Sequence, residues 1–142
     1  MRAMAIEENK ATVRRFYAQV LNDGNLDALP ELVADDFIEN DPLPGQGKGL
    51  AGLVQRVCIL KSAFPDLRFT IDDVVGEGDK VIVRWTMQGT HLGEFLGVPA
   101  TGKTAKATGV DIILLRDGQM AEHWHELDAL GLLQQIGGIP DS

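Results

Sequence analysis

Hydrophobic and polar residues follow different spacings in the two halves of the chain. In the first half, apolar residues recur at every third or fourth position, which predicts amphipathic helices at 7–22 and 49–63. In the second half, apolar and polar residues alternate over 67–75 and 80–89, which predicts strands with one buried face. The chain therefore changes from helix to strand near its middle.

Shorter segments complete this pattern. Asn25 is placed to cap a short second helix, and residues 35–40 resemble a short extended segment. Residues 41–47 contain two prolines and two glycines, which predict a loop. Two long strands are predicted at 104–116 and 119–128, joined by a tight turn, and a short helix follows them.

The order of these elements indicates the fold class. Helices that come first and strands that come last are typical of an α+β fold, and the turns are short enough for antiparallel hairpins. A length of 142 residues suggests one domain, residues 1–142. We expect a curved antiparallel sheet whose concave face carries the N-terminal helices and encloses an apolar pocket.

Composition narrows the classes of partner and the compartment. The net charge is −8, with 21 acidic and 13 basic residues, so binding to nucleic acid or to anionic membranes is disfavoured. No apolar run approaches the roughly 20 residues of a membrane span, and the first residues do not resemble a signal peptide. The lone cysteine, Cys58, is interpreted as a small core residue and requires no oxidising compartment. We therefore expect a cytoplasmic protein.

Two ionisable residues on the last two strands are the strongest candidates for chemistry. Asp111 interrupts the apolar run 110–115, where a carboxylate is costly unless it is paired, hydrogen-bonded or used. The turn near Asp117 places Asp111 opposite residues 120–124, so His125 is a diagonal neighbour that a bulge or twist would bring close. The alternative is that Asp111 is a buried polar residue satisfied by its surroundings.

Three stretches resemble a known family. They are the Asp23-Gly24-Asn25 break with the following Leu29–Asn40, the segment GTHLGEFLGVPATGK at 89–103, and RDGQMAEHW at 116–124 continued through LLQQIG at 132–137. Together they are similar to the SnoaL-like polyketide cyclases, also called predicted ester cyclases, of the nuclear-transport-factor-2-like superfamily. The resemblance implies a cone-shaped α+β fold with a deep apolar pocket, commonly in a homodimer.

The resemblance also implies a reaction. In the characterised cyclases an Asp on the last strand acts as acid and base in a cofactor-free intramolecular aldol closure, and a His on the preceding strand assists. Without gaps, these two positions fall on His125 and Asp111, so the residue types are exchanged in this chain. We expect His125 to be the acid/base, since the imidazole pKa of about 6.5 suits that task, and Asp111 to orient it.

The expected substrate is a small apolar carbonyl compound, undergoing aldol cyclisation or isomerisation without a cofactor. The residues expected to contact it are Asn40, Trp85, His91, Phe95 and His123. Two alternatives remain open, which are a hydrolase that uses the same pocket and a non-catalytic ligand-binding or dimerisation module. A cupin-like metal site at His123 and His125 is also conceivable, but the second cupin motif is absent and no metal is expected.

Overall fold

The computed structural model describes residues 2–140. Its elements, in chain order, are α1 (Arg2–Arg15), the π-helical segment η1 (Phe16–Asn22), the 3₁₀ turn η2 (Leu26–Ala28), α2 (Leu29–Leu32), β1 (Val33–Glu39), α3 (Gly49–Ala63), β2 (Arg68–Glu77), β3 (Lys80–Thr90), β4 (Thr104–Arg116), β5 (Gln119–Leu127) and α4 (Ala129–Ile136).

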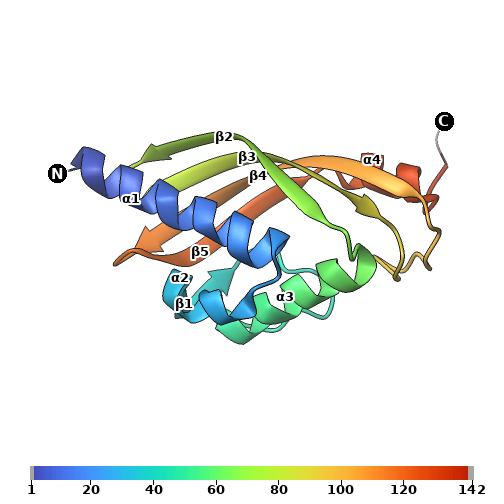
Figure 1. Cartoon of the computed structure of the whole chain (residues 1–142), viewed down its shortest axis with the longest axis horizontal. Coiled ribbons are helices and arrows are strands. Elements are labelled where there is room, and N and C mark those ends of the chain that lie inside the picture. The colour runs from blue at the N-terminus through green and yellow to red at the C-terminus, as the bar shows by residue number, and fades with distance from the viewer. Residues whose placement is uncertain (1, 141–142) are drawn as a thin grey trace.

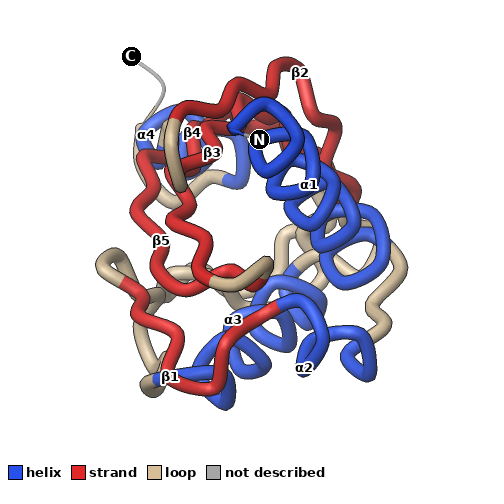
Figure 2. The backbone as a smooth tube through the Cα atoms, turned by 90° about the vertical axis from the view of Figure 1, so that its left-hand side faces the viewer, coloured by secondary structure: helices blue, strands red, loops and turns tan. Residues whose placement is uncertain are grey.

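The strands form one curved sheet in the order β1-β5-β4-β3-β2. The four strands β2 to β5 form an antiparallel meander, and β1 is added beside β5 in the parallel direction. In Figure 2 the sheet bends around the interior, with α1 and α3 on its inner side. Figure 1 shows α1 lying lengthwise over the strands. The predicted α+β architecture with a curved sheet is therefore confirmed.

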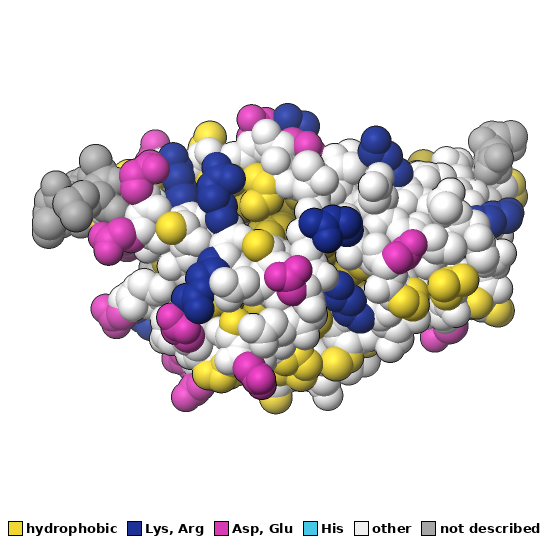
Figure 3. All heavy atoms as spheres, in the orientation of Figure 1, with side chains coloured by type: hydrophobic (Ala, Val, Ile, Leu, Met, Phe, Trp, Pro, Cys, Tyr) yellow, Lys and Arg dark blue, Asp and Glu magenta, His cyan; other side chains and the backbone are white. Residues whose placement is uncertain are grey.

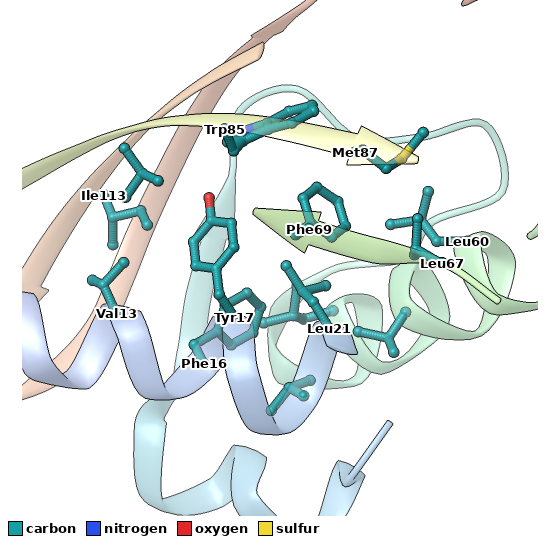
Figure 4. Close-up of a cluster of buried hydrophobic side chains, with 14 of the residues drawn as sticks. Val13, Phe16, Tyr17, Leu21, Leu60, Leu67, Phe69, Trp85, Met87 and Ile113 are labelled. Atoms are coloured by element: carbon teal, nitrogen blue, oxygen red, sulfur yellow. The ribbon is translucent and has the colours of Figure 1, made fainter. Parts of the chain in front are cut away.

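The alternating pattern of β3 produces the predicted burial. Val81, Val83, Trp85 and Met87 all point inward and are buried, while the residues between them are more exposed. They pack against Phe69 of β2 and against apolar side chains of the N-terminal helices (Figure 4). Burial of such large apolar side chains is the main stabilising contribution to a fold of this size.

Local capping signals account for several boundaries. The side chain of Asn25 accepts a hydrogen bond from the backbone N–H of Asp27, which caps η2 as predicted. Helix α3 begins and ends at the predicted residues, 49 and 63. Gly137 ends α4 in the left-handed conformation, with φ of 85°, which glycine adopts without steric cost.

Two features of the fold differ from the prediction or were not foreseen. Cys58 is exposed on α3, because its position falls on the outer side of the helix, so its interpretation as a core residue was wrong. The end of the first predicted helix is a π-helix, η1, in which both Phe16 and Tyr17 are buried. Short π-helical segments occur often at functional sites.

The outer surface carries both signs of charge. On the face shown in Figure 3, acidic and basic side chains are interspersed, with small apolar patches between them. Among the described residues, no helix is long and apolar enough to cross a membrane.

Candidate active site

An apolar cavity lies between the inner face of the sheet and the helices. It encloses about 700 Å³ of empty space, including its opening to solvent. Most of its wall is apolar, and its polar lining residues are Arg56, Trp85, Asp111, His123 and His125. An apolar pocket with a few convergent polar groups is the usual form of a small-molecule binding site.

A bulge in β5 sets the register of the two strands that carry these residues. Leu114 pairs with Glu122 but Leu115 pairs with Met120, so Ala121 is the additional residue. Beyond this bulge, the Cα of Asp111 pairs directly with that of His125. His125 was expected to be a diagonal neighbour of Asp111, and the extra residue in β5 places it directly opposite.

The carboxylate of Asp111 nevertheless bonds to a different histidine. His123 Nε2 lies 2.9 Å from Asp111 Oδ1, and the hydroxyl of Tyr17 donates to Asp111 Oδ2. On its other side, His123 Nδ1 lies 2.7 Å from Oε1 and 2.8 Å from Oε2 of Glu39. Asp111 therefore holds His123, in place of the predicted orienting bond to His125.

The two carboxylates keep His123 protonated. Burial alone lowers the pKa of His123, but the hydrogen bonds to Asp111 and Glu39 outweigh it and raise the pKa to about 9. Both ring nitrogens of an imidazolium donate, which matches a carboxylate on each side. His123 is thus a cation with both ring nitrogens engaged by carboxylates.

His125 has the opposite electrostatic character. Its ring stacks on that of His123, with centroids 5.4 Å apart and planes 6° from parallel. The guanidinium of Arg56 lies 3.3 Å from its Nδ1 and 3.4 Å from its Nε2. Burial first, and then the charges of Arg56 and His123, lower the pKa of His125. A lowered pKa leaves a neutral imidazole at neutral pH, as a base requires.

Arg56 is fixed beside this imidazole by groups from β1 and from the loop that follows it. Its Nη1 donates to the backbone carbonyl of Asp41 at 3.2 Å and to Oε1 of Gln46 at 3.0 Å. The same nitrogen lies 3.5 Å from Oε1 of Glu39. Asp41 also accepts the backbone N–H of His125 at 2.8 Å. The loop after β1 therefore anchors both His125 and Arg56.

Comparison with known proteins identifies the family. The family model for SnoaL-like polyketide cyclases matches residues 11–136. This chain belongs to the SnoaL-like polyketide cyclase family.

Individual relatives agree with that assignment. The SnoaL-like chain is 26% identical over 129 residues to the aklanonic acid methyl ester cyclase DauD of Streptomyces sp. (strain C5), covering 88% of this chain and 79% of that one. It is also 26% identical over 129 residues to the aklanonic acid methyl ester cyclase DnrD of Streptomyces peucetius, covering 88% of each chain. The structure of TsrD from Streptomyces laurentii superimposes with a TM-score of 0.86 and 32% identity, covering 94% of this chain and 97% of TsrD.

The predicted substrate contacts of this SnoaL-like protein fall into two groups. Trp85, Phe95 and His123 line the cavity, where a ligand could reach them. Asn40 and His91 are not among its lining residues, and their contact with a substrate stays a prediction.

Each of these two residues has a partner outside the cavity. Asn40 donates to Glu122 and to the carbonyl of His123, each at 3.0 Å, at the seam between β1 and β5. His91 is fully buried, and its Nδ1 lies 2.9 Å from the Thr101 hydroxyl, which ties the 90–103 connection together.

One group of side chains in this SnoaL-like protein has the composition of a metal site. Among the described residues, Glu39, His123 and His125 offer ligand atoms that lie within 4.8 Å of one another. Both nitrogens of His123 are already engaged by carboxylates, and the Arg56 guanidinium faces the other two residues. A cation at this position would have to displace an imidazolium proton beside a fixed positive charge, so the group is poorly suited to metal binding.

Proposed function

We propose that this protein is a cofactor-independent polyketide cyclase, with residues 1–142 acting as one SnoaL-like domain. The substrate class we infer is an apolar polycyclic or aromatic compound with at least two carbonyl groups, one of which closes a ring by aldol addition. Family membership and the relatives' activities support the reaction class, and the largely apolar cavity supports the substrate class.

The residues of the cavity supply the two functions that ring closure needs. Neutral His125 removes a proton alpha to one carbonyl, and the guanidinium of Arg56 beside it stabilises the negative oxygen of the resulting enolate. The enolate carbon then forms a bond to the second carbonyl carbon. The alkoxide produced takes back the proton from protonated His125, so the step is balanced without a cofactor.

Asp111 contributes through His123. Its carboxylate and that of Glu39 fix the His123 imidazolium under the face of His125. The positive charge of His123 then disfavours premature protonation of His125. Asp111 is therefore proposed as a positioning residue, in contrast to its expected direct bond with the base.

A single observation carries this proposal. His125 lines the cavity, its pKa is lowered, and among the described residues its ring nitrogens have the Arg56 guanidinium as their hydrogen-bond partner. An imidazole in that state is ready to accept a proton from a ligand in the cavity.

The reaction is tested by incubating the protein with aklanonic acid methyl ester, the compound in the names of DauD and DnrD, in ¹⁸O-labelled water. We expect an isomeric product with one additional ring, formed without added metal or cofactor. Hydrolysis of the ester would instead release an acid that carries ¹⁸O. Recovery of unchanged, bound ligand would favour a binding module and would contradict the proposal.

We also propose that the protein is a cytoplasmic homodimer. The outer face of the sheet carries apolar side chains, including Val110 and Ile112, each 36% exposed, and such a patch suits a second copy of the chain. The exposed free thiol of Cys58 is compatible with a reducing compartment. Sedimentation equilibrium is expected to give twice the mass of one chain, and Ile112→Lys is expected to lower it. A monomer at all concentrations would contradict this arrangement.

A further inference from the structure

Trp85 presents a polar group that the reaction described above does not use. The residue lies on β3, lines the cavity and is 5% exposed. Its indole nitrogen, Nε1, is buried and has no hydrogen-bond partner among the described residues. An indole N–H is a donor only, and buried tryptophans normally find an acceptor for it. An unpaired donor on a residue that lines a cavity therefore requires an explanation.

A glycine on the neighbouring strand leaves space for the indole ring of Trp85. Gly109 of β4 is the direct partner of Trp85 in the sheet. A Cβ at Gly109 would lie 2.3 Å from Cζ2 and 2.6 Å from Cη2 of the indole, which no real contact allows. The benzene edge of Trp85 that adjoins Nε1 consequently rests on β4 where a side chain is missing.

A second contact fixes the orientation of the indole. The ring of Phe69 meets that of Trp85 edge to face, with centroids 5.0 Å apart and planes at 73° (Figure 4). Both rings line the cavity, and so does Met87 beside them. The donor is thus held in place by packing before any ligand arrives, which lowers the entropic cost of using it.

The position of Trp85 separates it from the proposed base. Asp111 and His125 form one pair across β4 and β5, whereas Trp85 lies on β3 opposite Gly109, two residues along β4 from Asp111. The cavity is therefore lined by charged groups around His125 and, on another strand, by a residue with an unused neutral donor. A ligand that contacts both residues spans from β3 to β5.

We propose that the Trp85 indole N–H donates a hydrogen bond to a neutral carbonyl or phenol oxygen on the part of the substrate remote from the reacting carbon. This inference rests on the proposed function, because it assigns Trp85 as a positioning residue for the same substrate. A neutral oxygen is favoured over an anion, since the surrounding wall is apolar and a charge there would lose its hydration without compensation.

The proposal is tested by binding of two probes that differ in one oxygen. 9-Fluorenone carries a ketone on a rigid tricyclic frame, and fluorene has a CH₂ group at the same position. We expect Trp85→Phe to weaken fluorenone binding by about five- to tenfold more than fluorene binding in isothermal titration calorimetry, because the variant loses one neutral hydrogen bond. The loss of ring area affects both probes alike.

Trp124→Phe is the matched control. Trp124 lies on β5 and pairs with Ile112 of β4, which is on the outer face of the sheet. The Nζ of Lys80 lies 5.6 Å from the centroid of the Trp124 ring, so Trp124 also belongs to the outer face. This variant should bind both probes as the unaltered protein does. If Trp85→Phe fails to fold, incorporation of benzothienylalanine at position 85 keeps the ring shape and replaces the N–H by sulfur.

Two results would overturn the assignment of Trp85. One is that Trp85→Phe weakens the binding of both probes equally, and the other is that the unaltered protein does not bind fluorenone. Fluorenone has no hydrogen alpha to its carbonyl, so it binds without enolisation. Its affinity therefore does not depend on His125 acting as a base. A preparation that fails to cyclise a polyketide can still show the Trp85 effect, and an active cyclase can lack it.

Discussion

Replacement of His125 by alanine is expected to lower the kcat of ring closure by about 10²- to 10⁴-fold, the usual contribution of a positioned general base. The imidazole is the proposed acceptor of the substrate proton and the donor to the final alkoxide. The KM should change much less, because His125 forms a small part of a cavity wall that is mostly apolar. Steady-state kinetics with aklanonic acid methyl ester measures both quantities.

The control is the stability of the same variant. His125 makes no hydrogen bond to a carboxylate through its ring among the described residues, so its removal leaves the chain from Glu39 to Tyr17 intact. Its midpoint of urea unfolding should stay close to that of the unaltered protein. A folded His125→Ala protein with an unchanged kcat would remove His125 from the mechanism.

The second large effect is a loss of stability at alkaline pH. The pKa of His123 is about 9 in the folded protein, against about 6.5 in an unfolded chain, so the folded state binds this proton more tightly. The resulting stabilisation is complete below pH 6.5 and disappears as the pH rises through 9. Between pH 6 and pH 10 the free energy of unfolding should fall by on the order of 3 kcal/mol, measured by urea titration.

Two variants identify His123 as the source of this loss. His123→Gln removes the titrating group, so the fall in unfolding free energy between pH 6 and pH 10 should be largely abolished. It also leaves Glu39 and Asp111 buried without their shared cation, at a cost of about 3–5 kcal/mol at neutral pH. Asp111→Asn keeps the imidazole but removes one carboxylate, so the alkaline loss should begin at lower pH. An unaltered profile in both variants would assign the loss to other groups.

Much of the fold could be predicted from periodicity alone. The alternation in 80–89 placed Trp85 and Met87 on the buried face, and helix 49–63 has the predicted bounds. The pairing of β1 with β5 was not predicted, because parallel neighbours far apart in sequence leave no local signal. The π-helical segment η1 was likewise predicted as α-helix, since its apolar residues continue the apolar face of the helix predicted at 7–22.

The candidate site was predicted in part. Asp111 was recognised because a carboxylate in an apolar strand needs a partner, and the predicted hairpin placed His123 and His125 on the neighbouring strand. Glu39, Arg56 and Tyr17 were missed as members of the site. Tyr17 lies 94 residues from Asp111 and fits the apolar stripe of its helix, so its pattern indicates packing only. The unmet need of Asp111 for partners was the one signal that pointed toward such residues.

The register of β4 and β5 shows how one residue changed the prediction. A regular hairpin from the turn near Asp117 would pair Asp111 with Trp124 and would place His125 on the opposite face of the sheet. Ala121 adds one residue to β5 and moves His125 into that place. A bulge of this kind depends on packing around two adjacent buried residues, Met120 and Ala121, and turn chemistry alone does not reveal it.

The chain of bonds from Glu39 through His123 and Asp111 to Tyr17 joins four segments, β1, β5, β4 and η1. None of these segments can complete the arrangement alone, and the first and last polar groups come from the N-terminal third of the chain. A newly made molecule therefore completes this chain of bonds only when its earliest and latest parts have met. We expect the proposed active site to form late in folding for that reason, and a fragment that lacks either end cannot assemble it.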